Sequence, residues 1–217
     1  LGRAEITNNI YSIMVQTFDG KQNTLPSRLE KSNKYPSIFT KTAQATPGAS
    51  GDVFTQLGMY WQLHLAYDSG EKPMDFYNRF FKAWKAGTYT TGASSYDDRV
   101  ALTAAGVAEK DLTEFFTRWG MALSAQTRDQ LASYGGEDRA VWYLSDQSRR
   151  DRLEGTGTLS GSFTASAVLA EGTANKVTLT IDGSGLTGSL QGYEILRNGQ
   201  SIDFVVPENG SKSAVYT

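Results

Sequence analysis

The spacing of apolar residues changes near the segment LEGTGTLSGS, from Leu153 to Ser162. Before this segment, apolar and aromatic residues recur every three or four positions, and all four tryptophans lie there. After it, Gly, Ser, Thr and Val are frequent, and apolar residues alternate with polar ones. The first spacing is typical of amphipathic helices and the second of strands. We therefore expect an α+β protein with a domain boundary at about residue 156.

The two parts differ in their predicted architecture. We expect a mainly helical domain over residues 1–155, followed by a small antiparallel β-sandwich of immunoglobulin or fibronectin type over residues 156–217. In the second part Val177, Leu179 and Ile181 share one face, and Asn198-Gly199 is typical of a hairpin turn. With about 60 residues, the sandwich is shorter than the usual ~100. Either strands are missing from it or the chain is cut off at its end.

The composition excludes several classes of function. The net charge of −2 is spread over interspersed signs, so nothing indicates a nucleic-acid partner. No apolar run reaches the roughly 18 residues that a transmembrane segment needs. The absence of cysteine excludes disulfides, thiol catalysis and thiolate metal sites. A zinc site commonly uses two or three imidazoles, and the chain has only His64, which we expect to be a buried or hydrogen-bonded histidine.

The stretch RAEITNNIYSIM, near the start of the chain, predicts an amphipathic helix. Its core stripe consists of Ile6, Ile10, Ile13, Met14 and Phe18, and its polar stripe of Glu5, Asn8, Asn9, Ser12 and Gln16. Glu5 and Asn9 are one turn apart and leave the same face, so a carboxylate there could bind a metal ion that the amide helps to orient. Spacing alone favours a simpler interpretation, in which Glu5 lies on a solvated face near the positive end of the helix dipole.

Four segments together resemble the enhancin-like gluzincin metallopeptidases, which include secreted mucin-degrading enzymes of gut bacteria and the accessory colonization factor proteins. These segments are EITNNIYSIMVQ, LGMYWQLHLAY, FYNRFFKAW and VWYLSDQSRRDRL, and they cover most of residues 4–155. In that family a His-Glu-x-x-His helix supplies two zinc ligands and the catalytic Glu. A later helix, written roughly Glu-Val-Thr-Asn-Asn-Ile, supplies the third ligand. The tail of the chain resembles the Ig-like modules that often follow such catalytic domains.

The resemblance implies a role for four residues. Glu5 would be the third zinc ligand, Asn9 would support it through a hydrogen bond, and Asn8 and Ser12 are candidates for the substrate cleft. No His-Glu-x-x-His occurs in the 217 residues, so the other two ligands and the general base would lie upstream of Leu1. We therefore expect no catalytic residue within this chain, no tightly bound zinc and no peptidase activity of the chain alone.

The resemblance also implies a biological setting. The intact protein would be a zinc metallopeptidase, secreted or on the bacterial cell surface, that hydrolyses peptide bonds in glycoproteins such as mucins. The β-sandwich would bind glycan or the cell surface, and apolar surface left open on the chain would favour self-association. The alternative is a non-catalytic bacterial surface protein for adhesion or glycan binding, with helical and Ig-like domains and a merely solvated Glu5 stripe.

Three other segments have plainer interpretations. The adjacent acids of YDDR, Tyr96–Arg99, come directly after Ser95 and indicate a helix cap rather than a glycosidase pair. The charge run SRRDR, Ser148–Arg152, is typical of a solvated face. The weak alternation in RAVWYLSD, residues 139–146, predicts a short strand.

Overall fold

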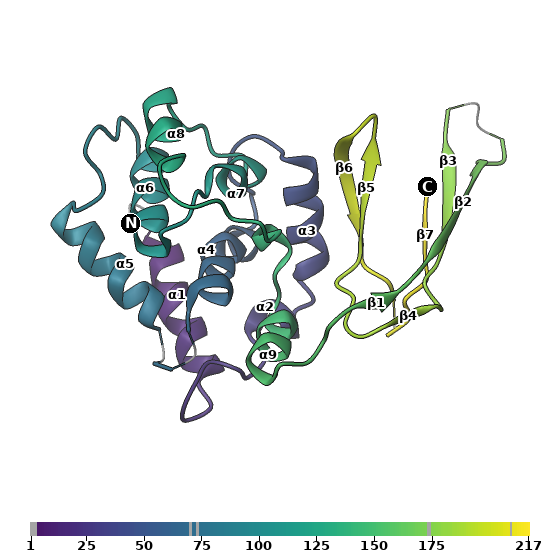
Figure 1. The fold of residues 1–217 in the computed structure, drawn as a ribbon, viewed down its shortest axis with the longest axis horizontal. Coiled ribbons are helices and arrows are strands. Elements are labelled where there is room, and N and C mark those ends of the chain that lie inside the picture. Colours follow the sequence, from purple (N-terminus) through teal and green to yellow (C-terminus); the bar gives the residue numbers. More distant parts are fainter. Residues whose placement is uncertain (1–3, 70, 73, 173–174, 209) are drawn as a thin grey trace.

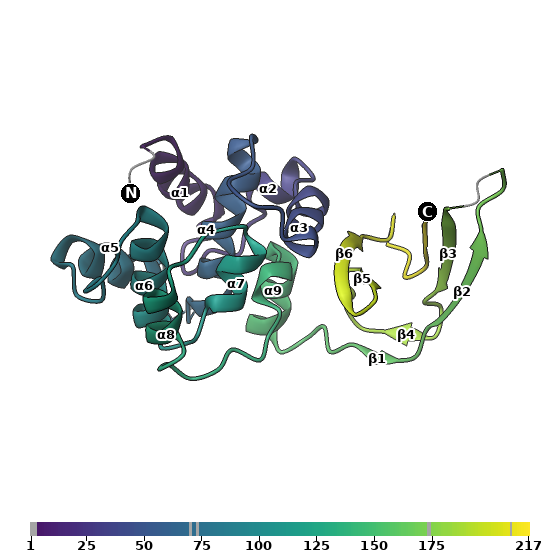
Figure 2. The same cartoon turned by 90° about the horizontal axis from the view of Figure 1, so that it is seen from above.

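The computed structural model describes residues 4–69, 71–72, 74–172, 175–208 and 210–217, and for Ala4 and Glu5 the backbone only. Its helices are packed together, and its strands lie beyond them on the side of α3 (Figures 1 and 2). The α-helices are α1 (Ala4–Thr17), α2 (Arg28–Lys31), α3 (Tyr35–Gln44), α4 (Val53–Tyr67), α5 (Asp75–Ala86), α6 (Tyr96–Ala108), α7 (Thr113–Arg118), α8 (Ala125–Leu131) and α9 (Asp146–Glu154), with a 3₁₀ turn η1 (Val141–Tyr143) before α9.

Helix α4 occupies the centre of the helical part. It is buried without interruption from Leu57 to Ala66, as expected of a helix that is apolar on nearly all sides. Gly58 lets α3 approach closely, because a Cβ atom at this position would lie 2.7 Å from Cδ1 of Ile38. No helix in the described part of the chain has both the length and the apolar character needed to cross a membrane.

The apolar stripe of α1 packs on this centre. Ile6, Ile10, Ile13 and Met14 are all at most 4% exposed, which confirms the predicted core face. Phe18 was also expected in that stripe, and this was wrong: it follows the end of the helix at Thr17 and is 43% exposed. Its backbone instead forms an isolated β-bridge with Asn23.

The strands form small antiparallel sheets, so the α+β class is confirmed. Strands β2 (Thr164–Leu169), β3 (Val177–Asp182) and β7 (Ala214–Tyr216) form one sheet in the order β2-β3-β7, β1 (Ser160–Gly161) pairs with β4 (Leu186–Thr187), and β5 (Tyr193–Arg197) pairs with β6 (Gln200–Val205). The predicted hairpin turn is confirmed, because Asn198 and Gly199 connect β5 to β6 with φ of 54° and 79°. A small apolar cluster around Ile181 and Tyr193 lies between the sheets.

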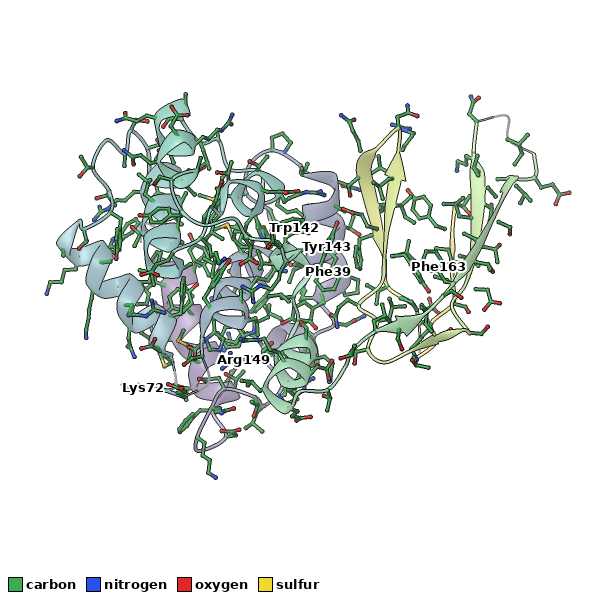
Figure 3. The ribbon with its side chains drawn as sticks, viewed as in Figure 1. Phe39, Lys72, Trp142, Tyr143, Arg149 and Phe163 are labelled. Carbon is green, nitrogen blue, oxygen red and sulfur yellow. The ribbon has the colours of Figure 1, made fainter. Side chains whose placement is uncertain are left out.

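The β5–β6 hairpin lies beside α3, between the helices and the remaining strands (Figures 1 and 2). Phe204 of β6 is 7% exposed and belongs to the apolar core of the helices rather than to the cluster of the strands. Its ring centre lies 5.1 Å from that of Phe39 on α3 and 4.3 Å from that of Tyr143 on η1. Figure 3 shows Phe39 and Tyr143 on the side of the helices that faces the strands. The hairpin is therefore packed into the helical part.

The segment RAVWYLSD does not form a strand, so that prediction was wrong. Residues 141–143 form a 3₁₀ turn in which Tyr143 N–H donates to the carbonyl of Ala140. The carbonyl of Trp142 accepts from the side-chain amide of Gln62 at 2.6 Å. A local carbonyl and a side chain of α4, rather than a paired strand, thus bind the backbone of Tyr143 and Trp142. The helices end at Glu154 and the strands begin at Ser160, while the division into two domains near residue 156 stays a prediction.

Candidate functional site

The polar face of α1 is bound by one arginine. Arg28 is the first residue of α2, and its guanidinium donates to three side chains of α1. Nη1 donates to Oδ1 of Asn9 at 2.7 Å, Nε donates to Oε1 of Gln16 at 3.0 Å, and Nη2 donates to Oγ of Ser12. These partners span two turns of α1, so one rigid group fixes most of the polar stripe.

The structure places the predicted site residues in different surroundings. Asn9 and Ser12 are half-buried and bind Arg28, whereas Asn8 is exposed. Glu5 lies in the first turn of α1, but its side chain is outside the described part of the structure. The assignment of a metal ligand to Glu5 and of substrate contacts to Asn8 and Ser12 therefore stays a prediction.

A buried carboxylate holds α2 in place. Asp146, the first residue of α9, is 4% exposed and accepts hydrogen bonds from Ser27 Oγ at 2.5 Å, Tyr35 Oη at 2.8 Å and Trp61 Nε1 at 2.9 Å. Burial raises the pKa of Asp146 above its usual value, and the three hydrogen bonds oppose this shift. Ser27 also caps α2 by accepting from Leu29 N and Glu30 N. Asp146 therefore fixes the start of the helix that carries Arg28.

The arginines of α9 add two further attachments. Arg149 is 2% exposed, so the expectation of a solvated face for SRRDR was wrong for this residue. Its guanidinium donates to the carbonyls of Asn23 and Asp68 at 3.2 and 3.1 Å. Arg150 forms a two-point contact with Glu30 of α2, at 2.6 and 3.0 Å. Helix α9 thus holds α2 at its N-cap and at its third residue.

Sequence reasoning missed Arg28 and Asp146 as contributors to this face. A signal for α2 exists in the sequence, because Ser27 precedes Glu30 by three residues, the spacing of a capping box. No local signal pairs Ser27 with Asp146, since 119 positions separate them in the chain.

His64 is a structural residue of the core, as expected. Its side chain is fully buried, its ring stacks on Trp61 with centres 4.3 Å apart, and its Nδ1 lies 3.1 Å from Oδ2 of Asp68. Burial lowers the pKa of His64 and the charge of Arg149 lowers it further, while Asp68 acts in the opposite direction. The only imidazole of the chain is therefore closed off from the polar face of α1.

This burial predicts that the protein loses stability as the pH falls from 7.5 to 5.5. Below about pH 6.5 the unfolded chain binds a proton at His64 that the folded chain binds less readily, so unfolding becomes easier. The slope is at most about 1.4 kcal/mol per pH unit, because one proton is involved. Because the chain has a single histidine, His64→Gln should flatten this part of the profile. Urea unfolding at several pH values measures how the free energy of unfolding depends on pH. If His64→Gln keeps the slope of the wild type, the assignment of this pH dependence to His64 is wrong.

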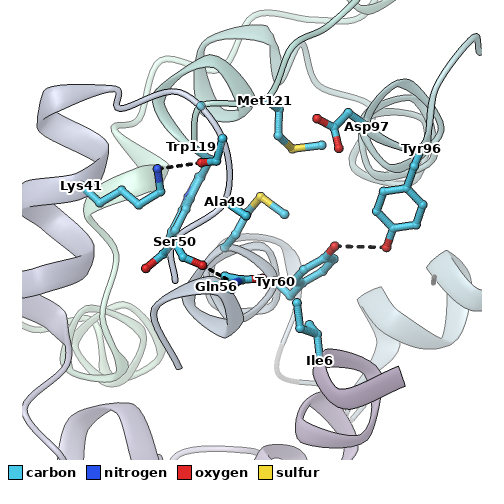
Figure 4. A pocket seen from close by; sticks show the side chains of 13 residues that line it. Ile6, Lys41, Ala49, Ser50, Gln56, Tyr60, Tyr96, Asp97, Trp119 and Met121 are labelled. Carbon is cyan, nitrogen blue, oxygen red and sulfur yellow. Dashed lines mark hydrogen bonds between the residues drawn. The ribbon is translucent and has the colours of Figure 1, made fainter. Parts of the chain in front are cut away.

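A pocket lies beside α1, at its junction with α4 and α6. Its cavity volume is about 70 Å³. Its lining residues are Ile6, Lys41, Gly48, Ala49, Ser50, Gln56, Met59, Tyr60, Tyr96, Asp97, Trp119, Gly120 and Met121. Figure 4 shows the hydroxyls of Tyr60 and Tyr96 turned toward each other, and they are 3.4 Å apart. Neither Asn8 nor Ser12 lines this pocket.

The donor set of the described residues does not by itself form a metal centre. Within those residues, no three His, Asp or Glu side chains gather in a way that could hold a metal ion. Tetrahedral zinc takes nitrogen, oxygen or sulfur ligands, and the chain lacks cysteine while its only imidazole is buried. Helix α1 carries one carboxylate residue, Glu5, one turn before Asn9, whose side-chain oxygen accepts a hydrogen bond from Arg28.

The chain matches one protein family and several solved structures. The sequence description of the family "Peptidase M60, enhancin and enhancin-like" matches residues 2–120. The M60 catalytic domain of ZmpC from Clostridium perfringens, solved in complex with the sialyl T antigen, is similar with a TM-score of 0.68 and 26% identity. That match covers 99% of this chain and 41% of the ZmpC chain. No match was found among the curated proteins.

A second solved structure shows the same fold. The ZmpB metallopeptidase from Clostridium perfringens has a TM-score of 0.67 and 23% identity to this chain. Here too the match covers nearly all of this chain, 98%, and 40% of the other. The chain therefore spans less than half the length of either relative, and both matches include the strands after α9.

Proposed function

Because the chain belongs to the enhancin and enhancin-like Peptidase M60 family, we propose that it forms part of a secreted zinc metallopeptidase that cleaves glycoproteins such as mucins. In this proposal α1 delivers Glu5 to the zinc ion, and residues 1–155 form one wall of the substrate cleft. The single observation that carries the proposal is the fixed polar face of α1, a feature that a merely solvated helix does not need. Activity also requires a His-Glu-x-x-His helix, which these 217 residues lack.

The residues of this chain have limited and specific tasks. Zinc, when bound, polarises the scissile carbonyl and makes its water a better nucleophile. Glu5 contributes one ligand, and Asn9 orients it from the next turn of α1. We expect the chain by itself to be inactive, because it has one histidine, His64, and the proposed zinc site uses two.

The pocket beside α1 supports the assignment of a substrate cleft. Its lining includes Ile6, the residue that follows Glu5, and the aromatic side chains of Tyr60, Tyr96 and Trp119, of which Tyr60 and Trp119 are only 3% exposed. Aromatic and carboxylate groups together suit a partly apolar, partly polar ligand such as a glycosylated side chain. The complex of ZmpC with the sialyl T antigen shows that a related catalytic domain binds such a glycan. We propose that this pocket receives part of the glycopeptide.

Zinc content tests the role of Glu5. The protein to measure carries this chain together with a His-Glu-x-x-His helix, as wild type, as Glu5→Gln and as the control Glu154→Gln, which alters an exposed carboxylate at the end of α9. We expect about one zinc ion per chain in the wild type and the control, and a large loss after dialysis in Glu5→Gln, because a zinc site with one ligand fewer binds weakly.

Peptide cleavage tests the substrate. The wild type should cleave a peptide that carries an O-linked glycan and spare the same peptide without it. Full zinc content in Glu5→Gln would refute the metal assignment. Zinc binding without cleavage of either peptide would refute the peptidase and leave a non-catalytic surface protein.

A further inference from the structure

We propose that the guanidinium of Arg28 and the ring of Phe54 form a binding site for a carboxylate group of the substrate, beside the polar face of α1. The proposal rests on the proposed function only in that the carboxylate belongs to the glycopeptide. An acidic sugar and an acidic amino-acid side chain both carry such a group. Neither Arg28 nor Phe54 lines the pocket between α1, α4 and α6, so this is a separate site.

The partners of Arg28 leave its positive charge unbalanced. The guanidinium binds the side chains of Asn9, Ser12 and Gln16, which are all neutral. No carboxylate among the described residues forms an ion pair with it, whereas Arg150, which also contacts α2, is paired with Glu30. A half-buried cation among neutral groups still attracts an anion strongly, because the surrounding protein screens less than water does.

The guanidinium also has donors left for a ligand. Arginine carries five N–H groups, and one each on Nε, Nη1 and Nη2 is used by Gln16, Asn9 and Ser12. The part of the chain that the structure describes supplies no further acceptor, so one N–H remains on each terminal nitrogen. Hydrogen bonds from a guanidinium to a carboxylate are charge-assisted and strong. The contacts to α1 already hold the group in place, so a ligand would lose little affinity to ordering it.

The ring of Phe54 supplies an apolar surface next to this cation. Phe54 is the second residue of α4 and is 39% exposed, although most of this helix is buried. Cζ of Arg28 and Nζ of Lys34 each lie 6.0 Å from the centre of the ring. An exposed ring beside a charged donor suits a ligand that has both an apolar part and an acidic group.

The nearest lysines make the surroundings more positive. Lys31, the exposed last residue of α2, is three positions after Arg28 and therefore on the same side of this short helix. The charge of Lys34 is balanced by Asp52, whose carboxylate lies 2.9 Å away. Arg28 and Lys31 thus leave an excess of positive charge, which attracts an anion over about 8–10 Å at moderate salt.

Binding of small carboxylates to the 217-residue chain tests the site without zinc or cleavage. One probe is the methyl glycoside of N-acetylneuraminic acid, an acidic sugar, and its uncharged match is the methyl ester of the same glycoside. The other is N-acetylglutamic acid α-amide, matched by N-acetylglutamine amide. In ¹⁵N–¹H spectra the Nε–H signal of Arg28 and the backbone amide of Phe54 should shift saturably with at least one acid and with neither neutral match. The acid that binds identifies the source of the carboxylate.

Variants show which residues bind the acid. Arg28→Gln should weaken binding about tenfold or more, because a charged donor is lost. Lys31→Gln should weaken it about two- to fivefold, as expected for one exposed charge. Arg79→Gln removes the same charge from an exposed position of α5, where Arg79 pairs with Asp75, and it should leave the affinity unchanged. If Arg28→Gln does not fold, Arg28→Lys serves: it keeps the charge but lacks the guanidinium, and it should still bind several-fold more weakly.

Three results would overturn the proposal: no saturable shift with either acid, equal binding of the neutral matches, or the same loss of affinity in Arg79→Gln as in the Arg28 variants. These results are separate from those that test the zinc ligand. If Glu5→Gln loses zinc but no acid binds, the proposed function stands and this site does not. If an acid binds as described but Glu5→Gln keeps its zinc, the site stands and the metal assignment fails.

Discussion

Replacement of Asp146 by alanine is expected to lower the free energy of unfolding by about 3–5 kcal/mol, because it leaves three buried donors without an acceptor. The variant removes the common acceptor of Ser27, Tyr35 and Trp61, whose polar atoms would remain buried without it. Each buried donor left unsatisfied costs about 1–3 kcal/mol. Trp61 and Ser27 are at most 1% exposed, so water cannot easily take the place of the carboxylate.

The effect of this variant should extend to α1. Loss of the Ser27 contact frees the N-cap of α2, so the hydrogen bonds of Arg28 to α1 should weaken as well. Urea unfolding measures the loss of stability, and hydrogen exchange at α1 amides measures its spread. Asp129→Ala, at an exposed position of α8, is the control and should change stability by less than about 0.5 kcal/mol. An effect of Asp146→Ala as small as the control would show that the buried network contributes little.

Phe204→Ala is expected to cost about 3–5 kcal/mol and to loosen the β5–β6 hairpin from α3. Phe204 lies in β6 but packs among Phe39 and Tyr143 of the helical core, so its removal leaves a cavity between the two parts. Truncation of a buried aromatic ring loses both its burial and its contacts, because the surroundings relax only partly.

Calorimetry and hydrogen exchange together test this prediction. The midpoint of thermal unfolding should fall, and amides of β5 and β6 should lose protection before those of α4. Leu196→Ala, on the same hairpin but 56% exposed, should have little effect. If the helices unfold in Phe204→Ala as they do in the wild type, the strands do not contribute to the stability of the helical part.

Local patterns predicted several elements correctly. The apolar positions from Ile6 to Met14 repeat at helical spacing and form the core face of α1. Asn198-Gly199 predicted the turn of the β5–β6 hairpin, because both residues tolerate the positive φ that this turn requires. The segment YDDR starts a capped helix, as expected: Oγ of Ser95 accepts from Asp98 N at 3.0 Å, whereas the carboxylate of Asp98 accepts from Ser94 and Ser124. In each case the physical cause lies within a few residues.

The errors arose where distant residues decide the outcome. Arg149 lies in a charged run and was expected to be solvated, yet its guanidinium is buried beside the carboxylate of Asp68 and the carbonyl of Asn23. Residues 141–143 alternate weakly like a strand, but Gln62 satisfies their backbone and leaves a 3₁₀ turn. Phe18 has helical spacing, but the helix ends one residue before it.

The sequence by itself determined the α+β class, the apolar face of α1 and the hairpin turn, because periodicity and backbone preference act over short distances. Only the tertiary structure decided that Arg28 binds the polar face of α1, that Asp146 holds the start of α2, and that Phe204 belongs to the helical core. These contacts join residues from different helices and strands. Their partners become neighbours only when the apolar faces of those elements are buried together, and no local pattern specifies that arrangement.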